Sequence, residues 1–432
     1  MRTAIDRVFG LTEQHSNIRQ EVTAGVTTFL AMAYITVVNP SILSAAGMDF
    51  GAVFVATCLA AAFGTAIMGL YANYPVAQAP GMGQNAFFTY GIVLGAGHSW
   101  QSALGAVFIS GLIFIALSVL PVREWLINAI PRSLKLGISA GIGFFLGIIA
   151  LSGSGVIVSN EATLVGLGDL TQTPAILMLF GFVVIAALSA RRVVGAVVIG
   201  MLLVTLLGWA TGAAGFAGVV STPPPLTTLF ELDIAAALDL SMVTVILTLL
   251  LVDVFDTAGT LVGVANRAGM LDDNGHLPRL RRALLSDSSA TTVGALLGTS
   301  STTSYIESAA GVEAGGRTGL TALVTAALFL LCLFFAPLAR SIPAFATGAA
   351  LLFVATIMAR ALEDLAWGDV GESAPAVVTA LAIPLSYSIA DGIGLGFITY
   401  ALVKVASGNA SRCPLAVYMV AAIFMLKFGF LS

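Results

Sequence analysis

Residues 74–90 read YPVAQAPGMGQNAFFTY, and residues 297–316 read LGTSSTTSYIESAAGVEAGG. Both stretches lie among long apolar runs, yet each is too rich in Gly, Pro, Ser or Thr for an ordinary lipid-facing helix. Unwound backbone at membrane depth is tolerated only where protein buries it or where it lines a water-filled cavity. The two stretches therefore predict a pair of interrupted helices around a polar site inside a membrane protein.

The composition of the whole chain supports this interpretation. Of its 432 residues, 58% are hydrophobic and only 9% are charged, and the mean hydropathy is +1.01. Soluble domains carry about 25% charged residues, and apolar runs of the length that crosses a bilayer recur along this chain. We expect an all-α polytopic membrane protein. The net charge of −4 offers no basic face for nucleic acid.

The apolar runs divide into fourteen spans, seven in each half, separated by a Pro-rich loop. In the first half they are Ala24–Val38, Phe54–Tyr71, Val76–Val93, Gln101–Leu120, Leu134–Ser152, Pro174–Leu188 and Val193–Trp209. In the second half they are Leu240–Val262, Ser288–Thr299, Thr302–Gly315, Gly319–Phe335, Phe345–Ile357, Ala374–Ile389 and Ile393–Val405.

Basic residues orient these spans, because cytoplasmic loops of membrane proteins are enriched in Lys and Arg. With the N-terminus inside, Arg340 is the one basic residue in an outer turn. The inner residues are Arg2, Arg7, Arg19, Arg123, Arg132, Lys135, Arg191, Arg192, Arg267, Arg279, Arg281, Arg282, Arg317, Arg360, Lys404 and Arg412. We expect a multi-pass protein of the inner (plasma) membrane with both termini cytoplasmic. Leu415–Phe430 is then expected to be a helix at the inner interface rather than a fifteenth span.

The two interrupted spans take the third position of their halves. Since each half has an odd number of spans, the second half would be inverted relative to the first. Interrupted spans at matching positions point to a transporter binding site; two packing helices without a ligand are the alternative. The expected parts are a cytoplasmic N-terminus (1–23), the first inverted repeat (24–212), an extracytoplasmic loop (213–239), the second inverted repeat (240–406) and the C-terminal interfacial helix (407–432).

Charged groups at bilayer depth are costly, by about 2.5–3.5 kcal/mol each on insertion scales. Span eight, LTLLLVDVFDTAGTLVGVANRAG at 247–269, nevertheless carries Asp253 and Asp256, three residues apart and therefore on one helix face. Two carboxylates so close repel each other if both are ionised, so one is expected to take up a proton. The pair is a candidate proton carrier. For Asp253, a hydrogen bond between helices without ligand contact is equally plausible.

A third acid, Glu307, follows the polar run Thr299–Ser304 of span ten, and Asn85 occupies the equivalent region of span three. An amide together with carboxylates suits a planar heterocycle with N–H and C=O groups, because carboxylates accept N–H bonds and an amide both donates and accepts. Rings that could stack on such a ligand, or simply pack in the core, are Phe87, Phe88 and Tyr305. The chain has no Walker-type loop, no Ser–His–Asp arrangement and no His/Cys cluster. We therefore expect no enzyme activity, no cofactor and no metal.

Four stretches resemble the azaguanine/hypoxanthine–guanine permease family of the nucleobase–cation symporter superfamily. They are EVTAGVTTFLAMAYITVVNPSIL (21–43), APGMGQNAFFTYG (79–91), VDVFDTAGTLVGVANRAG (252–269) and GTSSTTSYIESAAGVEAGGRTGLTAL (298–323). One departure is Gln84, which stands where the resemblance leads us to expect an apolar residue. It neighbours the expected site, so the preferred purine is left open.

The resemblance implies two inverted seven-helix repeats, with spans 1–4 and 8–11 as a core domain and spans 5–7 and 12–14 as a gate domain. It also implies a homodimer that imports guanine, hypoxanthine or adenine with a proton by moving the core against the gate. Family positions implicated in binding or coupling match Gly83, Asn85, Asp253, Asp256 and Glu307. The substrate-binding residues we expect are Gly83, Asn85, Phe87, Asp256, Ser304, Tyr305 and Glu307, and the proton-coupling residues Asp253, Asp256 and Glu307.

Two other classes of function agree less well with the sequence. Anion carriers and channels of the same architecture need positive charge or neutral donors, whereas this site holds three acids and no Lys or Arg. A membrane enzyme has no motif in its favour.

Overall fold

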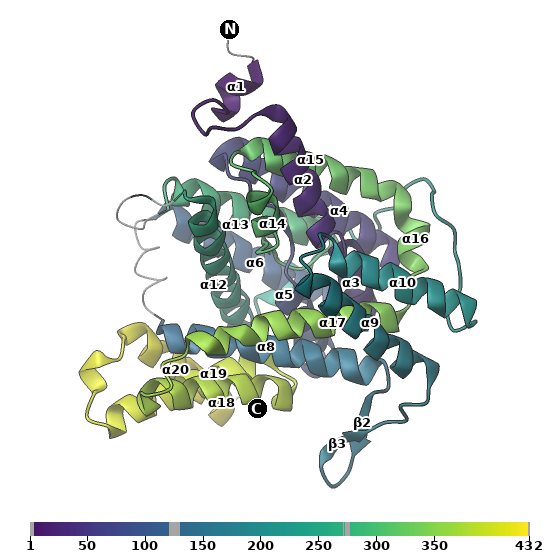
Figure 1. Cartoon of the computed structure of the whole chain (residues 1–432). Helices are drawn as coiled ribbons and strands as arrows, with labels where there is room; N and C mark the ends of the chain where they lie inside the picture. The colour runs from purple at the N-terminus through teal and green to yellow at the C-terminus, as the bar shows by residue number, and fades with distance from the viewer. Residues whose placement is uncertain (1–3, 121–129, 271, 273–276, 431–432) are drawn as a thin grey trace.

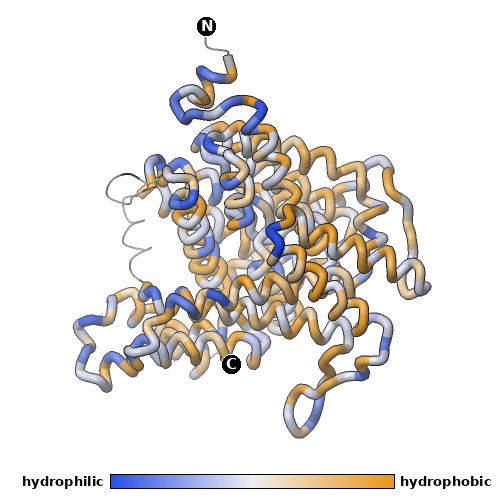
Figure 2. The backbone as a smooth tube through the Cα atoms, in the orientation of Figure 1, coloured by the Kyte–Doolittle hydropathy of each residue, from blue (hydrophilic) through white to orange (hydrophobic). Residues whose placement is uncertain are grey.

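The computed structural model describes residues 4–120, 130–270, 272 and 277–430, so Arg2 and Arg123 lie outside the described residues. Within these ranges, nine helices are long and apolar enough to cross a membrane. Hydrophobic residues line the helices, whereas hydrophilic residues gather in the N-terminal segment and in several connections between helices (Figure 2). The chain is a multi-pass helical membrane protein.

Each of the fourteen expected spans corresponds to one or more elements of the structure. The first half contains α1 (Ala4–Phe9), α2 (Ile18–Met32), α3 (Ile35–Ser44), α4 (Phe50–Ile67), η1 (Met68–Ala72), β1 (Gln78–Pro80), α5 (Met82–Ala86), η2 (Phe87–Gly95), α6 (Trp100–Val119), α8 (Arg132–Gly153), β2 (Ile157–Asn160), β3 (Leu164–Leu167), α9 (Thr173–Ala190) and α10 (Ala196–Ala210). Strands β2 and β3 form a small antiparallel hairpin between α8 and α9.

The second half begins with α11 (Ile234–Ala237), η3 (Leu240–Met242), α12 (Val243–Ala268), α13 (Leu280–Leu297), β4 (Thr302–Ser304) and α14 (Ser308–Glu313). It continues with α15 (Gly319–Cys332), η4 (Leu333–Phe335), α16 (Ala336–Arg340), α17 (Ala344–Ala359), η5 (Arg360–Asp364), α18 (Val370–Ser386), α19 (Ile389–Ala406), η6 (Ala410–Arg412) and α20 (Leu415–Phe430). The largest boundary difference is in span nine, where α13 begins at Leu280 rather than Ser288. Arg281 and Arg282 in its first turn are exposed, and the polar residues Ser286 and Asp287 that follow are buried against other helices, so hydropathy alone did not include this part of the helix.

Both expected interruptions are present, and they pair with each other. Strands β1 and β4 are antiparallel, with Gln78 opposite Ser304 and Pro80 opposite Thr302. Pro80 has no backbone N–H to give to a helix, and α5 starts two residues later. The backbone N–H of Gly81 donates to the Ser301 carbonyl at 2.9 Å. The unwound segments therefore satisfy each other's backbone groups in the interior of the protein.

The helices pack in two groups (Figure 1). In one, α8 packs against α17 and α18, α18 packs against α19, and α9 and α10 pack against α17. In the other, α15 packs against α2 and α4, α13 packs against α4 and α6, and α12 packs against α6. The paired strands β1 and β4 belong to the second group, because both contact α4 and α13.

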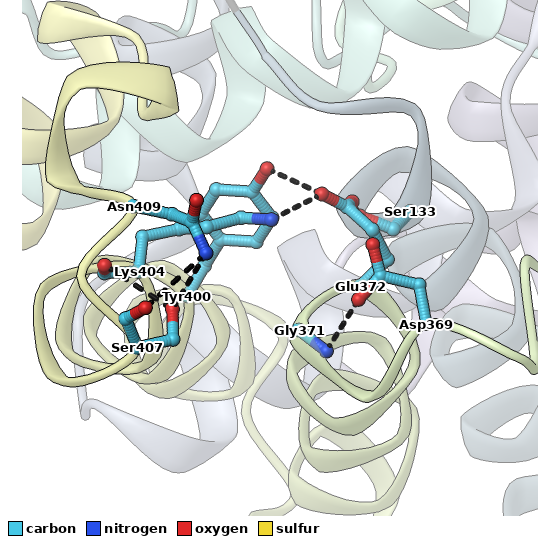
Figure 3. Close-up of polar contacts among 8 residues, drawn as sticks. All are labelled: Ser133, Asp369, Gly371, Glu372, Tyr400, Lys404, Ser407 and Asn409. Carbon is cyan, nitrogen blue, oxygen red and sulfur yellow. Dashed lines mark hydrogen bonds and ion pairs between the residues drawn. The ribbon is translucent and has the colours of Figure 1, made fainter.

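A polar cluster ties three helices of the first group together (Figure 3). Glu372 of α18 accepts hydrogen bonds from Ser133 Oγ of α8 at 2.5 Å and from Tyr400 OH of α19 at 2.8 Å. Lys404 Nζ of α19 lies 2.7 Å from the same carboxylate, and its side chain is only 10% exposed. A buried ammonium is tolerated when it is paired and hydrogen-bonded, so this cluster fixes the relative positions of the three helices.

Helix α20 lies antiparallel to α19. Lys427 in its last turn places Nζ 2.6 Å from Asp391 Oδ1, in the first turn of α19. Between these ends, Phe424 packs closely on Gly394. The helix expected at Leu415–Phe430 is present and runs along α19, and its place at the inner interface stays a prediction.

Close approach of η1 to α15 generates a prediction about stability. A Cβ at Gly69 would lie only 2.6 Å from the Gly319 carbonyl oxygen. Gly69→Val should therefore force the two segments apart, at the cost of about 1–3 kcal/mol that is typical of overpacking. We expect a lower thermal unfolding midpoint for the detergent-solubilised variant. Gly153→Val is the matched control, since a Cβ there meets nothing within 4 Å; equal midpoints for both variants would contradict the packing argument.

Candidate functional site

The two acids of α12 lie in different surroundings. Asp256 is exposed, whereas Asp253 is 0% exposed. Asp253 accepts hydrogen bonds from Gln84 Nε2 of α5 at 3.1 Å and from Thr291 Oγ1 of α13 at 2.8 Å. Asp253 thus makes the interhelical hydrogen bonds that the sequence allowed as an alternative, and Asp256 alone of the pair is accessible.

A further acid, Asp287 of α13, belongs to the same buried region and was missed in the sequence. It is 0% exposed. Its hydrogen-bond donors are Gln78 Nε2 at 2.8 Å, Thr257 Oγ1 at 2.6 Å and Ser304 Oγ at 2.8 Å. The expected boundary of span nine at Ser288 excluded it by one residue. The available signal was the polar run SDSS at 286–289 in an otherwise apolar segment.

Hydroxyl groups join the two buried acids into one network. Thr257 and Thr303 hydroxyls lie 2.8 Å apart, and Thr291 Oγ1 also lies 3.0 Å from the Thr302 carbonyl oxygen. The network connects α12, α13 and both strands of the interrupted spans. The charges of Asp253 and Asp287 act on each other, and the direct partners of both carboxylates are amides and hydroxyls rather than cations.

Glu307 and Asp256 form the more accessible part of the site. Glu307 immediately precedes α14, is half-buried, and accepts a hydrogen bond from Tyr34 OH at 2.6 Å. Tyr34 lies in the break between α2 and α3, a position that hydropathy does not reveal. The charge of Glu307 acts on Asp256. The structure therefore brings these two carboxylates within electrostatic reach, although 51 positions separate them in the sequence.

Asn85 of α5 faces the other interrupted span. Its side chain is fully buried, and its Oδ1 accepts a hydrogen bond from Ser300 Oγ. Its Nδ2 has no partner among the described residues. Buried polar groups nearly always have a hydrogen-bond partner, so this amide offers two donors for water or a ligand.

The remaining expected residues mostly have structural contacts. Phe87 is buried, Tyr305 donates its hydroxyl to the Pro80 carbonyl at 2.5 Å, and Ser304 is bonded to Asp287. Phe88, the other ring singled out in the sequence, is fully buried. Gly83 is half-buried and abuts Ile142 of α8, because a Cβ there would lie 2.6 Å from Ile142 Cγ2. Of the expected substrate-binding set, Asp256, Glu307 and Gly83 are accessible, while the aromatic residues pack as core.

Residues 19–395 match the Permease family, Xan_ur_permease. The chain belongs to this family. It is 46% identical to the adenine permease AdeP of Escherichia coli, over 99% of this chain and 96% of that protein. It is also 46% identical to the guanine/hypoxanthine permease PbuG of Bacillus subtilis, over 98% and 99%. Membership makes the chain a membrane permease rather than an enzyme.

The fold is also similar to that of a bicarbonate transporter. The transmembrane domain of a cyanobacterial bicarbonate transporter superposes with a TM-score of 0.66 at 17% identity, over 87% of this chain and 97% of that one. The similarity concerns the fold alone. The residues of the site, rather than the architecture, must then distinguish one permease from another.

The network around Asp287 predicts a large effect of its removal. Asp287→Ala would remove the carboxylate that accepts hydrogen bonds from three buried donors, and a buried donor left unsatisfied costs about 1–3 kcal/mol. We expect a marked fall in the thermal unfolding midpoint, and a smaller fall for Asp287→Asn, which keeps an acceptor oxygen. Asp169 is the matched control, because this exposed carboxylate also binds Thr171 and Gln172. If Asp169→Ala lowers the midpoint as much as Asp287→Ala, the buried network is not what stabilises this region.

Proposed function

We propose that this permease imports purine nucleobases, namely guanine, hypoxanthine or adenine, together with protons. The observation that carries the proposal is the pair of accessible carboxylates, Asp256 and Glu307, beside the interrupted spans of a chain whose full-length relatives are purine permeases. Purine rings present N–H groups to such acceptors. The two unpartnered donors of Asn85 complement them by offering N–H bonds to a carbonyl or ring nitrogen.

Proton coupling is supported by the surroundings of the acids. Two carboxylates, Asp253 and Asp287, are buried together, and within the described part of the chain their hydrogen-bond partners are neutral. Burial and mutual repulsion both favour the uptake of a proton by one of them, and the pair then titrates as a unit. Asp253, Asp256 and Glu307 remain the coupling candidates, and Asp287 joins them. We propose no cofactor besides the co-transported proton.

An inverted repeat with core and gate domains is supported by equivalent contacts in the two halves. The contact of α2 with α15 corresponds to that of α12 with α6, and the contact of α4 with α15 corresponds to that of α13 with α6. The antiparallel β1–β4 pair lies between the halves. In the proposed elevator movement, the group of helices around β1 and β4 carries the substrate past the group around α8 and α17, within a homodimer in the plasma membrane with a cytoplasmic N-terminus.

An anion carrier or channel is the second candidate, because the fold is shared with a bicarbonate transporter. The carboxylates of the site count against it, since they would repel an anion. Uptake into a bacterial strain that lacks purine transport separates the candidates. We expect accumulation of radiolabelled purine that unlabelled purines inhibit and bicarbonate or sulfate does not; competition by the anions alone would reject the proposal.

Substitution of Glu307 tests its role in binding. Glu307→Gln keeps the size of the side chain but replaces one acceptor oxygen by a donor amide. If Glu307 accepts a purine N–H, the lost bond should cost about 1–3 kcal/mol, which is about 5- to 150-fold in the dissociation constant. Equilibrium binding of radiolabelled purine to the purified variant measures this change.

Two variants serve as controls for that measurement. Glu313→Gln alters an exposed acid that pairs with Arg267 at 2.9 Å, and should leave affinity unchanged. Tyr34→Phe removes the hydroxyl bonded to Glu307 while keeping the carboxylate. Unchanged affinity in Glu307→Gln would exclude Glu307 from the binding site.

Substitution of Asp256 tests its role in coupling. Asp256→Asn imitates a permanently protonated side chain, so the variant should exchange purine across the membrane without concentrating it. The measurement is purine accumulation in proteoliposomes after a pH jump that creates an inward proton gradient, with counterflow as the exchange assay. If the variant still concentrates purine in response to the gradient, Asp256 is not the coupling site, and Asp253, Asp287 or Glu307 becomes the candidate.

A further inference from the structure

Gln84 occupies an unusual position at the start of α5. Its side chain is 1% exposed, and its amide N–H donates to Asp253 Oδ1 at 3.1 Å. Its amide oxygen is buried and has no partner among the described residues. That oxygen lies against Gly81, where any Cβ would overlap it. The side chain therefore folds back over the first turn of α5, with one end of its amide bonded and the other end free.

The same short helix contacts two other parts of the molecule. Gly81 N–H and Asn85 Oδ1 connect α5 to the segment before β4, through Ser301 and Ser300. On another side, Gly83 lies against Ile142 of α8, in the other helix group. A small displacement of α5 would consequently change contacts both within its own group of helices and with the group around α8.

The charged groups that act on Asp253 are Asp287 of α13 and Asp256 on α12 itself, and Glu307 acts in turn on Asp256. The direct partners of the Asp253 carboxylate are neutral, namely Gln84 and Thr291. A hydroxyl can rotate to donate or accept, whereas an amide must turn over to change from donor to acceptor. The Gln84 amide is therefore the partner whose orientation depends on whether Asp253 carries a proton.

We propose that Gln84 is a positioning residue that responds to the protonation of Asp253 and sets the position of α5 accordingly. The inference rests on the proposed proton coupling. With Asp253 ionised, the Gln84 N–H donates to Oδ1. When a proton from solution binds Oδ1, the new O–H donates to the Gln84 oxygen after the amide turns over, and no covalent bond of Gln84 changes. The amide N–H groups then face Gly81 and the first backbone N–H groups of α5, which have no acceptor within the helix. Because donors repel one another, α5 moves to separate them.

The test compares the pH dependence of purine transport in the wild type with that of Gln84→Met, a variant of similar shape without an amide. A hydrogen bond to an ionised carboxylate is stronger than one to the neutral acid. Loss of the Gln84 donor therefore favours the protonated form of Asp253. We expect the midpoint of the pH profile to move to higher pH by about one unit. Gln84→Glu, which adds a carboxyl beside Asp253, should move the midpoint further in the same direction. A purely structural role would lower the rate at every pH without moving the midpoint.

Gln172→Met is the matched control, because Gln172 makes the same amide-to-carboxylate bond to Asp169 in an exposed loop, at 2.7 Å. Its pH profile should equal that of the wild type. If the wild type does not accumulate purine in a proton gradient, the proposed coupling fails. If the wild type does so and both Gln84 variants keep its midpoint, the coupling stands and the role of Gln84 is overturned. Should Gln84→Met not purify as a folded protein, the Gln84→Glu midpoint decides.

Discussion

The hydrogen-bonding needs of backbone at membrane depth constrain the rest of this structure. A helix that stops inside the protein leaves N–H and C=O groups that lipid cannot satisfy. Here two interrupted spans solve the problem jointly, because β1 and β4 pair antiparallel and further bonds join their ends, including that from Tyr305 N–H to the Ala77 carbonyl at 2.9 Å. Side chains complete the pairing: the Thr65 hydroxyl bonds both backbone groups of Gln78. We call the antiparallel pair of β1 and β4 the crossing. Helices α4, α12 and α13 pack around it.

This arrangement explains why polar residues concentrate where they do. Helices that pack around two short strands must present hydroxyls and amides there, and Asp287 is held by donors from β1, α12 and β4. The buried acids therefore form hydrogen bonds that hold the paired strands and the surrounding helices together, whereas Asp256 and Glu307 remain accessible beside the strands. A protonation change at the buried acids would alter these hydrogen bonds. In the proposed function, binding at the accessible acids would be linked to the paired strands through adjacent residues of α12.

The sequence predicted the parts of the fold that depend on apolar length and on Gly and Pro. It located both interruptions and the helical segments on either side of them, because a chain in lipid shows its spans in its hydropathy. The count of fourteen spans stays a prediction, since nine helices of the described residues are long and apolar enough to cross a membrane. The sequence did not identify all the polar residues that are buried between helices. Asp287 was missed because the expected span nine begins at Ser288, whereas the helix begins at Leu280 and buries Ser286 and Asp287 against its neighbours. Tyr34 was missed because contact with Glu307 joins segments 273 positions apart.

The sequence placed Asp253 and Asp256 on one face of a helix, but it did not indicate that only one of them is accessible. Residues three apart on a helix differ by about 60° around its axis, which is enough to separate a buried from an exposed position at the edge of a helix contact. Asp253 falls on the side covered by α5 and α13, and Asp256 on the open side. A bicarbonate transporter has a similar fold, so the fold alone does not determine which ligand is bound. The exposure of Asp256, which this small rotation produces, is a property of the residues rather than of the fold. Helix starts at an interrupted span supply N–H donors in any chain with such a crossing, and these donors alone would suit an anion. An accessible carboxylate on the facing helix would add an acceptor and repel negative charge, which agrees with the proposed transport of a neutral purine that carries both donors and acceptors.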